Sequence, residues 1–148
     1  NGHGLGIACH FSYGGYCAHA FEVSVMKGKL HIHRAVCAID VGRVINPKGL
    51  EAQAIGGTVF GLSNALGQAI TVKDGQVQQH DFKQYPLAHM AQLPHTVEVY
   101  SVESSATPGG ASPVAVASAA PALANAVFAA TTVRIRRLPL LPELMRLL

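Results

Sequence analysis

The stretch CAHAFEVSVMKGKLHIHRAVCAI, residues 17–39, decides the fold of this chain. Two runs rich in β-branched and aromatic residues, 17–26 and 29–39, flank the dipeptide Lys27-Gly28. A two-residue break that contains glycine is typical of a tight hairpin, because glycine adopts the positive φ angle that such a turn requires. We therefore expect two long antiparallel strands joined at Lys27-Gly28.

Further strands are expected on both sides of this hairpin. Residues 5–13 are entered and left through glycines and read as a strand, and residues 96–102 alternate apolar with polar side chains. A second hairpin signal, Asp74-Gly75, separates two shorter runs, 69–73 and 76–79.

Two main helices are expected as well. Asn46 can cap a helix whose first residue is Pro47, and this helix extends to about Leu66. A second helix is predicted to open at Pro121. The predicted fold is α+β, a mixed or antiparallel sheet of hairpins with two main helices packed on it, in a single domain over residues 1–148.

The composition indicates a partner and argues against one class of ligand. Of the 148 residues, 49% are hydrophobic and only 13% are charged, so we expect the chain to bury surface against another polypeptide. The net charge of +3 comes mostly from scattered basic residues, which argues against nucleic-acid binding.

The cysteines and one long uncharged segment bear on localisation. Cys9, Cys17 and Cys37 are odd in number and form no CxxC pair, which disfavours a disulfide framework and favours a reduced, cytoplasmic compartment. A periplasmic location stays open for a chain carried by a partner, and we expect no signal peptide. Residues 52–72 carry no charge, but we expect no membrane span there because of their glycines and the polar Gln53, Ser63, Asn64 and Gln68.

Residues 104–133 form the most unusual segment, thirty positions without a charged side chain. The loop Pro108-Gly109-Gly110 lies near its start, and arginines at 134, 136 and 137 follow its end. A glycine-rich loop that feeds a helix can bring backbone N–H groups close to an anionic ligand, and it can equally serve packing. The residues alone leave both interpretations open.

Short motifs follow one another in a characteristic order along nearly the whole chain. They are AFEVSV (20–25), VCAIDVGRVINP (36–47), AQAIGG (52–57), DFKQYP (81–86), PGG (108–110), APALANAVFAAT (120–131) and RIRRLP (134–139). This succession resembles the C-terminal part of the molybdopterin-binding large (beta) subunit of the molybdenum hydroxylase family. The closest type is isoquinoline 1-oxidoreductase or aldehyde dehydrogenase, within the xanthine dehydrogenase superfamily.

The resemblance implies which residues meet the cofactor. In the family, the glutamine of the helix after the Asn-Pro segment contacts the molybdenum cofactor, and Gln53 matches it. The family's glycine loop also lies at the cofactor, so its matching residues are binding candidates. They are Gly109, Gly110, Ala111 and Ser112.

The same loop departs from the family at its catalytic position. It reads Gly-Gly-x-Gly-Glu-Pro in the family, where the Glu is the catalytic base, and Pro113 falls where that Glu would be. Proline has no ionisable group, and no Asp or Glu lies between Glu103 and Glu143. We therefore predict no catalytic residue in this chain.

The resemblance also implies partners. The matched segment is only the final portion of the family's large subunit, so we expect molybdopterin binding only together with the remainder of that subunit or another subunit, and with an iron–sulfur small subunit. The whole would be an oxidoreductase that hydroxylates N-heterocycles or oxidises aldehydes, and this chain would be catalytically incomplete alone. The alternative is a non-catalytic structural or assembly domain descended from that family.

Histidines supply a third hypothesis, a small metal-binding protein. His31 and His33 are two apart on a predicted strand and so share a face, with His19 or Glu22 expected opposite. Imidazoles so placed can bind a metal, and an exposed polar face is the other interpretation. Cys37 matches a position that is often Cys in the family it resembles, so the resemblance implies a small buried hydrophobe there.

Overall fold

A four-stranded sheet forms the centre of the structure, a computed structural model that describes residues 2–148. The strands are β1 (His3–Ser12), β2 (Gly15–Met26), β3 (Lys29–Asp40) and β6 (Val97–Ser101). They lie in the order β1-β2-β3-β6, so β1 forms one edge. β1, β2 and β3 pair antiparallel and β6 pairs parallel to β3, which makes the sheet mixed and confirms the α+β prediction.

The predicted hairpin at Lys27-Gly28 is confirmed. Met26 pairs with Lys29 across the turn. Lys27 and Gly28 have φ angles of 51° and 72°, the left-handed values that a two-residue hairpin turn requires.

A β-bulge interrupts this hairpin halfway along. Val23 pairs with Ile32, whereas the preceding residue Glu22 pairs with Arg34, so His33 is an extra residue in β3. Because side chains alternate along a strand, one extra residue exchanges the inward and outward faces of β3 beyond it.

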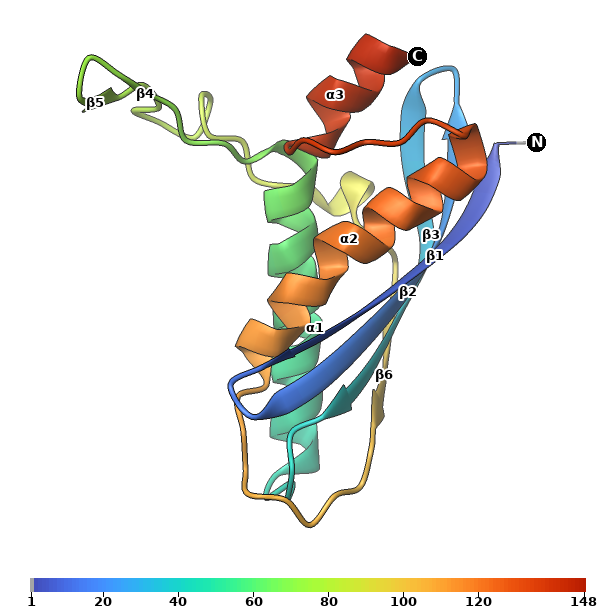
Figure 1. The fold of residues 1–148 in the computed structure, drawn as a ribbon, viewed down its shortest axis with the longest axis vertical. Helices are drawn as coiled ribbons and strands as arrows, with labels where there is room; N and C mark the ends of the chain where they lie inside the picture. The colour runs from blue at the N-terminus through green and yellow to red at the C-terminus, as the bar shows by residue number, and fades with distance from the viewer. Residues whose placement is uncertain (1) are drawn as a thin grey trace.

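Two long helices cover one face of the sheet (Figure 1). α1 (Pro47–Gly67) begins as predicted, with the Asn46 side chain accepting a hydrogen bond from the Gly49 amide at 3.0 Å. α2 (Ser112–Thr131) lies across β1 and β2 and packs against α1. The helix layer therefore joins segments far apart in the sequence.

The predicted start of the second helix was wrong. α2 begins at Ser112, and Pro121 lies inside it. A proline in a helix interior leaves the carbonyl four residues earlier without its donor. Ala117 and Pro121 both lie on the exposed side of α2, so water can reach that turn. Pro113 lies in the first turn, where a missing N–H is tolerated.

Within residues 2–148, α2 is the one helix long and apolar enough to cross a membrane by length and composition. In this structure α2 packs against β1, β2 and α1. A Cβ added to Gly6 of β1 would lie 2.0 Å from the Ala126 nitrogen, so β1 and α2 are in backbone contact.

Shorter elements complete the fold. The hairpin at Asp74-Gly75 is confirmed, although its strands have only two residues each, and it projects away from the body (Figure 1). A helix that was not predicted spans the Leu-rich segment 140–147 and buries Leu140 and Leu144 in the core. The bounds are β4 (Val72–Lys73), β5 (Gln76–Val77), the 3-10 turn η1 (Met90–Gln92) and α3 (Leu140–Leu147).

Candidate functional site

The glycine loop is fastened to one end of the sheet. The Gly109 amide donates to the Val41 carbonyl at 2.8 Å, and the Gly110 amide donates to the Tyr13 carbonyl at 2.9 Å. Figure 1 shows the same end, where the β1–β2 turn, the β3–α1 connection and the loop before α2 come together. In this structure both glycine amides are therefore used within the chain, and cofactor contact by Gly109 and Gly110 stays a prediction.

The start of α2 offers donors that the protein does not use. Among residues 2–148, no acceptor is recorded for the amides of Ala111 and Ser112, and no side chain caps the helix. Unpaired N–H groups at a helix start carry a partial positive charge. Pro113 is exposed beside them and adds neither a donor nor an ionisable group.

Gln53 lies close to this helix start. Its side chain is exposed on α1, and no hydrogen bond is recorded for it within the described residues. One turn farther on, a Cβ added to Gly57 would lie 2.6 Å from the Ser112 carbonyl oxygen, so the two helices touch there. Gln53 is thus about 6 Å along the α1 axis from the start of α2. The structure brings the predicted glutamine and Ser112 to one surface.

This surface is open in the isolated chain. None of the five main surface hollows found on residues 2–148 is lined by Gln53 or by residues 109–112. A ligand at Gln53 and Ser112 would contact an open surface and not an enclosed pocket.

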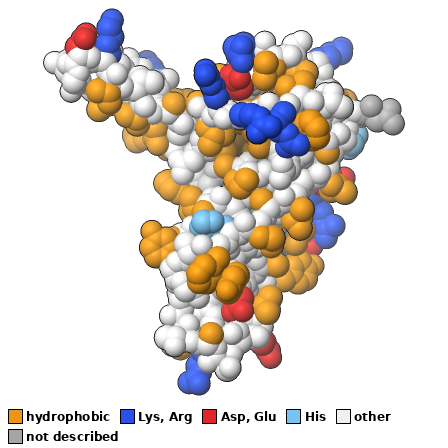
Figure 2. Space-filling view, in the orientation of Figure 1, with side chains coloured by type: hydrophobic (Ala, Val, Ile, Leu, Met, Phe, Trp, Pro, Cys, Tyr) orange, Lys and Arg blue, Asp and Glu red, His pale blue; other side chains and the backbone are white. Residues whose placement is uncertain are grey.

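Basic side chains lie at the opposite end of α2. Figure 2 shows Lys and Arg gathering near the segment that links α2 to α3. There Arg134 stands 3.6 Å from the centre of the Phe128 ring and donates to the Asn125 side chain at 2.9 Å. Arg134, Arg136 and Arg137 line a hollow of about 450 Å³. The hollow also borders Ala120, about 12 Å along α2 from Ser112, so these arginines and Ser112 do not meet at one small group.

The structure does not assemble the predicted histidine site. His31 and His33 are exposed, and His33 stacks on His3 with ring centroids 5.4 Å apart and bonds to the Ser24 hydroxyl at 2.7 Å. His19 faces the opposite way and is fully buried under the helices. The hypothesis of a metal site on His31 and His33 with His19 was therefore wrong, and no group that joins them to Glu22 is recorded among residues 2–148.

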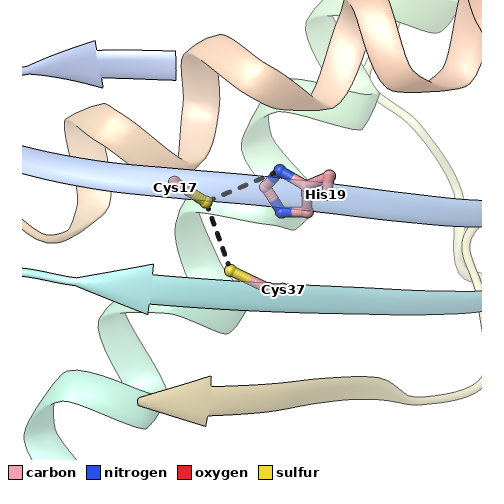
Figure 3. Close-up of side chains that lie close together, drawn as sticks. All are labelled: Cys17, His19 and Cys37. Carbon is pink, nitrogen blue, oxygen red and sulfur yellow. Dashed lines mark hydrogen bonds between the residues drawn. The ribbon is translucent and has the colours of Figure 1, made fainter. Parts of the chain in front are cut away.

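A different cluster is present inside the molecule (Figure 3). Cys17 and His19 come from β2 and Cys37 from β3, and all three are buried. The two sulfurs lie 3.5 Å apart, and the Cys17 sulfur lies 3.8 Å from His19 Nδ1. The hydrogen bond between the two thiols lowers the pKa of Cys17, and that same bond, with burial, raises the pKa of Cys37.

Hydroxyl groups from both helices complete the surroundings of His19. Its Nδ1 lies 2.8 Å from the Ser118 hydroxyl of α2, and its Nε2 lies 2.8 Å from the Thr58 hydroxyl of α1. Sequence reasoning missed this cluster. The one available signal was the alternation Cys17-x-His19, which places both on one strand face.

Comparisons with known proteins identify relatives of this chain. The family model of the molybdopterin cofactor-binding domain matches residues 4–94. Isoquinoline 1-oxidoreductase subunit beta of Brevundimonas diminuta is 34% identical over 147 residues, which cover 95% of this chain and 19% of that protein. The aldehyde oxidoreductase molybdenum-binding subunit PaoC of Escherichia coli is 28% identical over 134 residues, covering 84% of this chain and 18% of its own.

The fold recurs in solved structures. Quinoline 2-oxidoreductase from Pseudomonas putida 86 superposes with a TM-score of 0.80 at 22% identity, over 89% of this chain and 18% of that one. At this identity the likeness is one of fold. The chain spans about a fifth of the length of these relatives.

Proposed function

Because the chain belongs to the molybdopterin cofactor-binding domain family, we propose that it forms one wall of the cofactor site in a molybdenum hydroxylase large subunit. The observation that carries the proposal is the 34% identity to an isoquinoline 1-oxidoreductase beta subunit over 95% of the chain. That extent includes the α1 and α2 segments that bring Gln53 and Ser112 together.

The groups on this wall fit a pterin cofactor. The Gln53 side-chain amide offers both a donor and an acceptor, which suits the mixed donors and acceptors of a pterin edge. The Ala111 and Ser112 amides are donors at a helix start and suit an anionic group. Gly56 lies on the exposed side of α1, and nothing stands within 4 Å of the position its Cβ would take, so a flat group can approach there. When bound, the cofactor supplies the oxidation chemistry.

The wall lacks a catalytic base. Pro113 is exposed at the start of α2, at the position that matches the family's Glu, and it cannot accept a proton. The sequence holds no Asp or Glu from residue 104 to residue 142. We propose that this chain binds and orients the cofactor, and that it is not catalytically complete alone. A non-catalytic structural domain is the second candidate, and Pro113 is the observation that favours it.

An apolar strand edge supports a partner polypeptide. β1 is an edge strand of the sheet, and the face it turns away from the helices is apolar. Leu5, Ile7 and Phe11 are 72%, 64% and 56% exposed. Such an edge is prone to pair with another chain. The partner we propose is the remainder of the large subunit or another subunit, with an iron–sulfur small subunit in the whole assembly.

The test uses the chain purified with the polypeptides that accompany it. Molybdenum content, pterin fluorescence after denaturation and oxidation of N-heterocycles and aldehydes are measured together. Molybdenum and pterin in the assembly support the cofactor-binding role, and their absence supports the structural domain. Pro113→Glu is the matched variant. If Pro113→Glu gains activity in a cofactor-loaded assembly, the result supports the proposal that Pro113 occupies the position of the base. Equal activity of the wild type and the variant contradicts that proposal.

A further inference from the structure

We propose that Cys17, His19 and Cys37 form a zinc site, in which two thiolates and His19 Nδ1 bind one Zn²⁺ between the sheet and the helices. The site is separate from the cofactor wall, because its ligands point inward from β2 and β3 while Gln53 and Pro113 are exposed. Its role is structural, to tie the sheet to the helix layer.

The distances between the ligand atoms match a tetrahedral zinc ion. With Zn–S of about 2.3 Å and Zn–N of about 2.0 Å, neighbouring ligands of a tetrahedral site lie about 3.8 Å apart for two sulfurs and about 3.5 Å for sulfur and nitrogen. The corresponding separations here are 3.5 Å between Cys17 and Cys37 and 3.8 Å between Cys17 and His19 Nδ1. The third pair, the Cys37 sulfur and the His19 nitrogen, lies within 4.8 Å, so the side chains close by up to about 1.3 Å around the bound ion.

The hydrogen bonds of His19 leave Nδ1 as the ligand atom. The Thr58 hydroxyl donates to the Ala54 carbonyl at 2.8 Å, so its oxygen accepts the proton of His19 Nε2. The lone pair then resides on Nδ1, which lies 3.8 Å from the Cys17 sulfur and in this structure accepts from the Ser118 hydroxyl at 2.8 Å, so zinc takes the place of that hydroxyl on Nδ1. A metal-bound imidazole usually donates its other N–H to such a partner, which fixes the ring.

Charge and burial favour a divalent ion of borderline softness. Cys17 is 2% exposed, and His19 and Cys37 are fully buried. Zn²⁺ with two thiolates and a neutral imidazole carries no net charge, which suits a dry interior. Binding forms two Zn–S bonds and one Zn–N bond and releases the protons of both thiols to solvent. The Ser118 hydroxyl lies 2.8 Å from Nδ1, so its oxygen is the candidate for the fourth ligand once zinc occupies Nδ1.

The test measures zinc in the chain, purified with the polypeptides that accompany it, from medium supplemented with zinc. We expect about one zinc per chain, and a loss of at least about tenfold in Cys17→Ala and Cys37→Ala. Cys9→Ser is the matched control, because Cys9 is an exposed cysteine of β1 and keeps the cluster intact. Replacing zinc by Co²⁺ should give the visible bands of a tetrahedral site and a thiolate-to-cobalt charge-transfer band.

A milder variant covers the case in which the cysteine variants fail to fold. Thr58→Val keeps the side-chain volume and removes the acceptor for His19 Nε2, and it should weaken zinc binding about tenfold while circular dichroism stays unchanged. The proposal is overturned if the wild-type chain holds no more zinc than Cys37→Ala. It is also overturned if its mass shows the two-hydrogen loss of a Cys17–Cys37 disulfide without zinc. Neither outcome depends on molybdenum content, so this experiment tests the zinc site independently of the proposed cofactor role.

Discussion

Cys37 lies directly opposite His19 across β2 and β3, and both side chains point into the core because His33 is an extra residue in β3. Without this bulge, the pairing that starts at the hairpin turn would set Val36 opposite His19 and turn Cys37 outward. One residue of β3 therefore decides whether the buried cluster exists.

His19 is expected to contribute strongly to stability. It is fully buried and links α1 and α2 to the sheet through Thr58 and Ser118. His19→Ala leaves a cavity and removes the imidazole from the Thr58 and Ser118 hydroxyls, which keep only their helix-carbonyl bonds, so the free energy of unfolding should fall by about 3 kcal/mol. Urea unfolding of chelator-treated protein measures this loss of stability in the absence of bound metal.

Ser118→Ala is the matched control for this contact. It removes one hydroxyl and leaves the imidazole with its Thr58 bond, so the loss should be only about 1 kcal/mol. Equal losses in the two variants would contradict the bridging role of the His19 ring.

The sequence predicts the hairpin but not the bulge within it. Lys27-Gly28 is a local signal, because a turn of this kind depends on the φ angles of two residues. The bulge at His33 depends on how the whole sheet packs against the helices, and no local residue pattern indicates it. For this reason the sequence suggested His31 with His33, while the structure assembles Cys17, His19 and Cys37.

The two prolines of α2 show a similar limit. Proline is common at the first helical position, and Pro121 was predicted to begin the helix on that ground. The helix begins nine residues earlier and continues through Pro121, because α2 packs on β1 and β2 along its length, and Pro113 lies in its first turn. Tertiary contacts outweighed local propensity here. The Gln53 position was predictable because Asn46-Pro47 fixes where α1 begins.

Neighbouring glycines of α1 should respond oppositely to alanine. A Cβ on Gly57 would lie 2.6 Å from the Ser112 carbonyl oxygen and 2.9 Å from the Ala115 Cβ, so Gly57→Ala should push α1 and α2 apart and cost about 2 kcal/mol. Gly56 has nothing within 4 Å of that position, so Gly56→Ala should stabilise the helix by up to about 1 kcal/mol. Thermal unfolding of both variants checks the contrast. A loss of stability in Gly56→Ala would show that this side of α1 is not open.

Gln53→Ala should separate cofactor retention from folding. The side chain has no recorded partner within residues 2–148, so the melting temperature should be unchanged. In the assembled protein, loss of one or two hydrogen bonds to the cofactor should lower its affinity about tenfold, read as molybdenum content. Glu51→Gln is the control, because a residue two positions away on a helix faces elsewhere. Unchanged molybdenum content in Gln53→Ala would remove Gln53 from the site.

The ion pair between Arg34 and Glu98 should make stability depend on pH in one direction. Arg34 Nε and Nη2 donate to the two oxygens of Glu98 at 2.6 and 2.8 Å, which joins β3 to β6, and this bond holds the pKa of Glu98 below its usual value. A lowered folded-state pKa stabilises the protein above the unfolded pKa of about 4.3, and the gain is lost as pH falls through the folded value. Wild type should therefore melt slightly above Glu98→Gln at neutral pH, and the two should converge in acid. Because both side chains are partly exposed, salt should shrink the difference. A difference in melting temperature between wild type and Glu98→Gln that persists at acidic pH would mean that Glu98 acts through packing and not through its charge.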